Sequence, residues 1–173
     1  MKRLVIYYSK TGNNEFLAKE IARRLACDAE AIVEQKKRTM GTLIKEMLFR
    51  KLPAIREITH KVEDYDHLIL IAPVWGGIAA TPMIAFIDKH NGSIKKYSFI
   101  SVCGGALGEN AKLEGHLVKK TGRKPDIISQ LYINTLLPED KKNKTKYTSA
   151  YTVGPRDMDA FGPLLDAFMK TVS

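Results

Sequence analysis

The feature that most constrains the fold is an alternation of short apolar runs with longer stretches of helical periodicity. The strongest apolar run, at residues 67–72 (His-Leu-Ile-Leu-Ile-Ala), has the length of a strand rather than of a helix. Near-continuous apolar strands are typical of parallel sheets that helices cover on both faces. We therefore expect an α/β fold with residues 67–72 at the centre of the sheet.

The same alternation predicts the remaining elements. Strands are expected at residues 4–8, 28–34, 67–72, 97–102 and 127–133, and helices at residues 16–25, 81–90, 109–121 and 161–172. Thr81 is expected to cap its helix with Pro82 at the first helical position, and Gly122 to end the helix that precedes it. Since about 150 residues is the usual size of a domain, we expect residues 1–173 to form one domain with its own core.

Two segments do not follow the alternation. Residues 36–51 place six Lys or Arg residues around an apolar face, which predicts a basic amphipathic helix in an insertion near residues 36–56. Packing of that face against the flank of the sheet or a second copy is the favoured interpretation, and docking to an anionic membrane or an acidic partner is the alternative. Residues 138–149 are polar and lysine-rich, which predicts a solvated excursion that ends near residue 155.

Lys and Arg outnumber Asp and Glu by 28 to 19, giving a net charge of +9. This balance favours an acidic or phosphorylated partner, an anionic membrane or a nucleic acid. We expect no nucleic acid, because aromatic residues are not interleaved with the basic ones. The longest apolar stretch, residues 68–75, is too short to span a bilayer, and we expect no signal peptide.

The cysteine content favours a reducing compartment. Cys27 and Cys103 are the only two cysteines, and neither has a metal-like spacing to a histidine. We therefore expect neither a disulfide nor a structural metal, and we expect a cytoplasmic protein.

Ligands of open α/β sheets bind at the carboxyl ends of the strands. After the first expected strand, residues 9–14 (Ser-Lys-Thr-Gly-Asn-Asn) open directly into a helix. The amide groups and short polar side chains of such a turn form an anion site, which a phosphate fits without a lysine contact. An ordinary capped turn is an equally good interpretation of this segment alone.

Two glycine-rich loops are expected at the same edge. Residues 73–77 (Pro-Val-Trp-Gly-Gly) follow the central strand, and residues 103–110 (Cys-Gly-Gly-Ala-Leu-Gly-Glu-Asn) follow the fourth. Their glycines would let the backbone approach a flat ligand closely. Trp75 is predicted to be a stacking platform, with a plug at the end of the sheet as the alternative, and Cys103 to be a buried, inert thiol.

Together, the three loops resemble those of the flavodoxin-like family. Residues 9–14 are similar to its Thr/Ser-x-Thr-Gly-x-Thr phosphate loop, and the glycine-rich loops to its second and third flavin loops. The resemblance implies a three-layer, doubly wound, five-stranded parallel sheet of strand order 2-1-3-4-5, with FMN as the cofactor. The cofactor-binding residues that it implies are Ser9, Lys10, Thr11, Gly12, Asn13, Asn14, Pro73, Val74, Trp75, Gly76, Gly77, Cys103, Gly104, Gly105 and Gly108.

The sequence departs from the family pattern at two positions and in its charge. Asn14 stands where Thr or Ser is usual, and the third loop lacks the aromatic residue that often stacks on the flavin. Flavodoxins that carry electrons are typically acidic, whereas this chain is basic. By resemblance, the peptide between Gly76 and Gly77 would rotate so that its carbonyl accepts a hydrogen bond from N5 of the reduced flavin.

No catalytic side chain is expected, because a flavin carries the electrons itself. The favoured function is FMN-dependent electron transfer, the alternative is an FMN-dependent NAD(P)H:quinone-type oxidoreductase, and the third is a flavin-free binding module. For the oxidoreductase, Arg38 or the lysines of residues 141–146 would supply a basic pocket for the nicotinamide nucleotide. The expected partners are an acidic redox protein or NAD(P)H; peripheral membrane contact is left open, as is the choice between a monomer and a homodimer.

Overall fold

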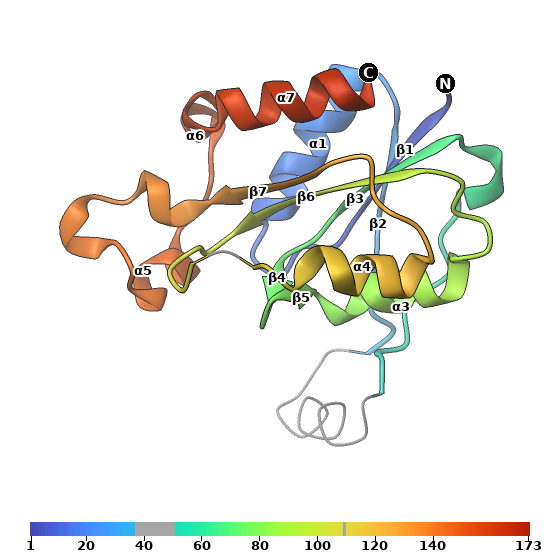
Figure 1. Ribbon diagram of the computed structural model, residues 1–173, viewed down its shortest axis with the longest axis horizontal. Coiled ribbons are helices and arrows are strands. Elements are labelled where there is room, and N and C mark those ends of the chain that lie inside the picture. The colour runs from blue at the N-terminus through green and yellow to red at the C-terminus, as the bar shows by residue number, and fades with distance from the viewer. Residues whose placement is uncertain (37–50, 109) are drawn as a thin grey trace.

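The computed structural model describes residues 1–36, 51–108 and 110–173 (Figure 1). Nearly all of the basic helix predicted at residues 36–51 lies outside the described residues. The described chain contains a five-stranded parallel sheet of order β2-β1-β3-β6-β7, which is the predicted order 2-1-3-4-5. Its strands are β1 (Arg3–Tyr7), β2 (Asp28–Ala31), β3 (His67–Ile71), β6 (Tyr97–Cys103) and β7 (Ile128–Tyr132).

Helices cover both faces of the sheet, as the apolar pattern predicts. On one face lie α1 (Asn13–Leu25) and α7 (Gly162–Val172), and on the other lie α3 (Thr81–His90) and α4 (Leu113–Thr121) (Figure 1). Two separate clusters of buried apolar side chains fill the spaces between these layers. The architecture is therefore the expected three-layer α/β sandwich.

Burial along the strands explains their positions in the sheet. Every residue of β3 is buried, which places it at the centre between β1 and β6. β2, by contrast, has no buried residue and forms one edge. It ends at Ala31, three residues earlier than predicted, because the chain then turns into an antiparallel bridge between Glu34 and Ile55.

Two further boundaries differ from the prediction. Thr81 does not cap α3: the helix begins at Thr81 itself, its N-cap is Ala80, and no side chain caps it. α4 begins at Leu113 rather than at residue 109. Gly122 ends it as predicted, with a left-handed φ of 73° that suits glycine.

The segment between β3 and α3 is a small β-hairpin rather than a plain loop. It consists of β4 (Val74–Trp75) and β5 (Ile78–Ala79), which pair in antiparallel register. The φ values of Gly76 (57°) and Gly77 (85°) are both positive, as the central residues of a type I′ turn require. The hairpin therefore depends on these two glycines.

The polar excursion after β7 has structure of its own. Its short helices are η2 (Ile133–Leu136), η3 (Glu139–Lys141), α5 (Thr145–Ala150) and α6 (Pro155–Ala160), while η1 (Val62–Asp64) precedes β3. Figure 1 shows the excursion extending from the carboxyl end of β7. None of the helices in the described residues is both long enough and apolar enough to cross a membrane.

Candidate functional site

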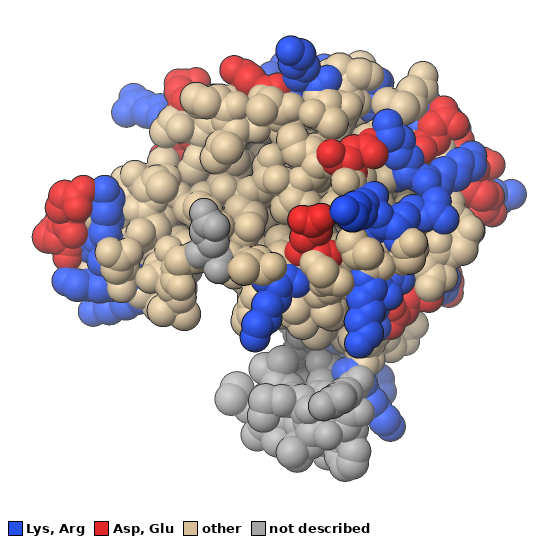
Figure 2. Space-filling view, in the orientation of Figure 1, with Lys and Arg blue, Asp and Glu red and all other residues tan. Residues whose placement is uncertain are grey.

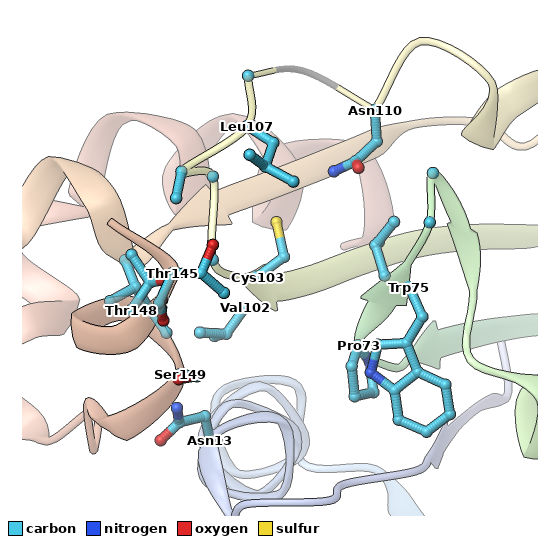
Figure 3. Close-up of a pocket in the computed structure, with 18 of the residues that line it drawn as sticks. Asn13, Pro73, Trp75, Val102, Cys103, Leu107, Asn110, Thr145, Thr148 and Ser149 are labelled. Atoms are coloured by element: carbon cyan, nitrogen blue, oxygen red, sulfur yellow. Dashed lines mark hydrogen bonds between the residues drawn. The ribbon is translucent and has the colours of Figure 1, made fainter. Parts of the chain in front are cut away.

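A cleft of about 610 Å³ opens at the carboxyl edge of the sheet. The loops after β1, β3 and β6 form three of its walls, as the sequence predicts, and α5 forms a fourth. Figure 3 shows Thr145, Thr148 and Ser149 on one side of this cleft and Trp75 on the other. Of the predicted cofactor-binding residues, all but Ser9 and Gly12 line the cleft.

The start of α1 has the features of an anion site. Gly12 precedes the helix with a left-handed φ of 93°, and no side chain caps the helix. The first amide groups of a helix have no carbonyl acceptor within it, and they carry the positive end of the helix dipole. Ser9 lies outside the cleft lining, and its hydroxyl accepts a hydrogen bond from the Gly12 N–H at 3.1 Å, which fixes the turn.

Asn14 holds the start of α1 against the end of β6. Its side-chain amide donates to the Val102 carbonyl and its side-chain oxygen accepts from the Val102 N–H, both at 2.9 Å. The residue is only 3% exposed. Asn14 thus positions the loop through two hydrogen bonds to the backbone. This role could not be predicted from the resemblance, which has Thr or Ser as the usual residue at this position.

Asn13 makes the equivalent connection to the C-terminal part of the chain. Its side-chain amide donates to the Tyr151 carbonyl and its side-chain oxygen accepts from the Val153 N–H, both at 2.9 Å. These bonds fix the segment that follows α5. The two asparagines therefore tie one loop to two walls of the cleft.

Trp75 lies in the hairpin and is 36% exposed. Its ring meets that of Tyr8 edge-on, with the centroids 5.9 Å apart and the planes at 88°. The Tyr8 hydroxyl donates in turn to the Glu34 carboxylate at 2.7 Å. The indole is thus positioned from the end of β1 at the edge of the cleft, and its role as a stacking platform stays a prediction.

The glycines of the third loop have a different physical basis from the one expected. A Cβ on Gly105, whose φ is 72°, would lie 2.6 Å from the Tyr132 ring, and a Cβ on Gly104 would lie 3.1 Å from the Thr148 hydroxyl. Packing against the protein itself therefore requires glycine at position 105 and leaves only a tight fit for a larger residue at position 104. A Cβ on Gly108 would meet nothing within 4 Å, although its φ of 86° still favours glycine.

Cys103 is a buried thiol on the cleft lining, as expected. Burial raises its pKa to about 12, so that the thiolate does not form at neutral pH. Redox or nucleophilic chemistry by this cysteine is therefore not part of the site.

Lys10 and Lys112 are the charged side chains among the described residues that line the cleft. The lysines of the excursion, by contrast, are engaged elsewhere: Lys142 pairs with Glu139, and Lys144 donates to the Asp140 carbonyl at 2.7 Å. On the face shown in Figure 2, basic side chains gather over α4 and the amino ends of the strands and at the tip of the excursion. The basic pocket predicted from the lysines of 141–146 is thus absent from the described lining, and Arg38 lies outside the described residues.

Sequence reasoning missed several residues of the lining. These are Val102, Ala106, Leu107, Asn110, Ala111, Lys112, Ile133, Thr145, Thr148 and Ser149. Ala106, Leu107 and Asn110 belong to the predicted loop of residues 103–110, although they are not among the implied cofactor-binding residues, and Val102, Ala111 and Lys112 flank that loop. The α5 residues had no local signal, because hydroxyl side chains among lysines are equally typical of a solvated loop.

A five-stranded sheet of order 2-1-3-4-5 with this cleft at its carboxyl edge defines a flavodoxin-like fold. Within that class, residues 1–119 match the family model of the NADPH-dependent FMN reductases. The chain belongs to this family, whose cofactor is FMN. A comparison with curated proteins finds no match.

Solved structures support the fold. A flavoprotein from Lactobacillus acidophilus NCFM, solved in complex with FMN, superposes with a TM-score of 0.62 at 19% identity, covering 75% of this chain and 92% of that one. A putative flavoprotein from Bacteroides eggerthii DSM 20697 gives the same TM-score at 20% identity and covers 93% and 98% of the two chains. At these identities the likeness concerns the fold alone.

Proposed function

We propose that this protein binds FMN in the cleft and acts as an oxidoreductase that takes electrons from a nicotinamide nucleotide. The observation that carries the proposal is the cleft itself, which joins an uncapped helix start to two further loops at the carboxyl edge of a sheet of this family. Its volume of about 610 Å³ lies within the range of about 300–1,000 Å³ that small-molecule sites occupy.

The residues present fit FMN. The α1 amides and their dipole suit the phosphate, and no side-chain cap occupies the start of the helix. The ring would lie between the hairpin at Trp75–Gly77 and the loop at Cys103–Gly105, as the family resemblance implies. When bound, FMN supplies the redox chemistry by accepting two electrons and a proton, so that the protein needs no nucleophile of its own.

The charge of the cleft supports a nucleotide as the electron donor. Lys10 and Lys112 line it, and no acidic residue does so among the described residues. Two cations facing one cleft favour an anionic second ligand, and the phosphates of NAD(P)H supply that charge. Family membership supports NADPH in particular.

The chain's own residues bind and orient in this proposal. The α1 amides hold the phosphate, the hairpin and the third loop position the ring, and Lys112 attracts the nucleotide. Gly76 and Gly77 allow a further adjustment, because rotating the peptide between them converts a type I′ turn into a type II′ turn. Glycine at position 76 is compatible with both turns, which leaves the hypothesis of peptide rotation physically sound.

An anaerobic titration tests the proposal. The purified protein is loaded with FMN, separated from free cofactor and mixed with NADPH or NADH while the visible absorbance of the flavin is recorded. We expect direct bleaching by NADPH. Bleaching that needs a separate reductase would favour the electron-carrier function, and a protein that does not retain FMN would contradict both functions.

A lysine variant with a matched control sharpens the test. Lys112→Gln is expected to raise the KM for NADPH about fivefold, the value for losing an exposed ion pair worth about 1 kcal/mol. The control is Lys119→Gln, which removes an exposed lysine of α4, the helix that Lys112 directly precedes; Lys119 does not line the cleft. An equal effect of both variants would mean that overall charge, rather than Lys112, attracts the nucleotide.

A further inference from the structure

α5 contributes a row of hydroxyl groups to the cleft. Thr145, Thr148 and Ser149 all line it, and Figure 3 shows them on the side of the cleft opposite Trp75. α5 lies beyond residues 1–119, the part of the chain that the family model matches. No residue of this helix belongs to the three loops that the family resemblance assigns to FMN.

The structure fixes α5 beside the start of α1. The Asn13 side chain, in the first residue of α1, bonds the backbone of Tyr151 and Val153 directly after α5. On the other side, Thr148 is only 4% exposed and packs against Gly104, where a Cβ would lie 3.1 Å from its hydroxyl. α5 is therefore a built part of the wall next to the predicted phosphate loop.

Two of the α5 hydroxyls make long hydrogen bonds to carbonyls of their own segment. The Thr148 hydroxyl donates to the Thr145 carbonyl at 3.2 Å, and the Ser149 hydroxyl to the Lys146 carbonyl at 3.3 Å. Both distances are well beyond the usual 2.7–2.8 Å for a hydroxyl donor. An ionised phosphate oxygen is a better acceptor than such a carbonyl, because hydrogen bonds to charged groups are about twice as strong as neutral ones.

We infer that the hydroxyls of Thr145, Thr148 and Ser149 bind the phosphate of FMN together with the α1 amides. This inference rests on the proposed FMN site and extends it by a fourth wall. Because hydroxyl groups and helix amides are uncharged donors, the wall adds specificity for a phosphate without adding a cation. A flavin that lacks the phosphate gains nothing from it.

The test compares the binding of FMN and riboflavin to the apoprotein by quenching of flavin fluorescence. Thr148→Val combined with Ser149→Ala is expected to raise the Kd for FMN about a hundredfold, which is about tenfold for each of the two hydrogen bonds lost to a charged group. The Kd for riboflavin is expected to stay unchanged. Thr148→Ser, which keeps the hydroxyl, is expected to bind FMN like the wild type.

Two further variants keep the test interpretable. Thr171→Val on α7 is the matched control, because its hydroxyl also donates to a carbonyl of its own helix, that of Ala167 at 3.1 Å, but outside the cleft. Thr145→Val changes an exposed position and is expected to weaken FMN binding even if the double variant folds poorly.

The outcomes separate the two proposals. An unchanged Kd for FMN in the α5 variants would overturn the fourth wall, as would an equal loss of FMN and riboflavin, which would indicate contact with the ribityl chain or the ring. Failure of the wild-type apoprotein to bind either flavin would instead contradict the proposed function.

Discussion

Replacing Asn14 with leucine tests how the cleft is held together. The substitution keeps the branching at Cγ and the number of heavy atoms of the side chain, but it removes both hydrogen bonds to the Val102 backbone. Since the site is buried, the Val102 N–H and carbonyl would have no replacement partner. A buried polar group left unpaired costs about 1–3 kcal/mol, so the two together are expected to lower the free energy of unfolding by about 2–6 kcal/mol.

Urea denaturation of the apoprotein, followed by circular dichroism, measures this loss. The melting temperature offers a second readout and is expected to fall by about 10 °C, since 1 kcal/mol corresponds to about 2–4 °C in a chain of this size. FMN affinity is expected to fall as well, because the α1 amides lose their connection to β6.

Asn134→Leu is the matched control. Asn134 also makes two hydrogen bonds, donating to the Asn143 side chain at 2.9 Å and accepting from the Asn143 N–H at 2.7 Å, but both are exposed. Water can replace exposed partners, so this variant is expected to lose less than about 1 kcal/mol. Equal losses in the Asn14 and Asn134 variants, or no loss in either, would refute the argument from burial.

Three further predictions concern packing, pH and thiol reactivity. Gly105→Ala is expected to lower the free energy of unfolding in urea by more than about 2 kcal/mol, because the new Cβ would overlap the ring of Tyr132. Gly108→Ala, where a Cβ meets no neighbour, is expected to lose only about 1 kcal/mol from its positive φ. Equal losses in the two variants would contradict the steric argument. Burial lowers the pKa of His67 below 6.5, so the unfolded chain binds the proton more tightly and the free energy of unfolding falls as the pH drops through 6.5. His67→Gln is expected to reduce this dependence of the unfolding free energy on pH. An unchanged pH dependence in the variant would contradict the argument. With the Cys103 pKa raised to about 12, we expect a thiol reagent at pH 8 to modify the partly exposed Cys27 but not Cys103 until the protein is denatured, and two rapidly reacting thiols in the native protein would show otherwise.

The sheet and three walls of the cleft could be predicted because their signals are local. The apolar run of β3 indicates a central strand by itself, and Gly76-Gly77 indicates a turn by itself. The boundary at Thr81 was wrong by one residue because a hydroxyl before a proline fits either the cap or the first turn.

The rest of the site depends on contacts between distant parts of the chain. Gly105 is a glycine because of Tyr132, and Thr148 reaches the cleft because Asn13 holds the backbone that follows α5. Neither relation leaves a pattern in one segment of sequence. The same holds for Asn14, whose partner on β6 is separated from it by 88 positions.

The hydrogen bond between Asn13 and Val153 spans 140 positions, so it can form only after most of the chain has been synthesised. During synthesis, the start of α1 leaves the ribosome long before the segment that completes its surroundings. Such long-range contacts form late, because the entropy of closing a long loop opposes them until the rest of the sheet is in place. A complete cleft therefore marks a chain that has finished folding, and a ligand that needs all four walls would be retained only by such a chain.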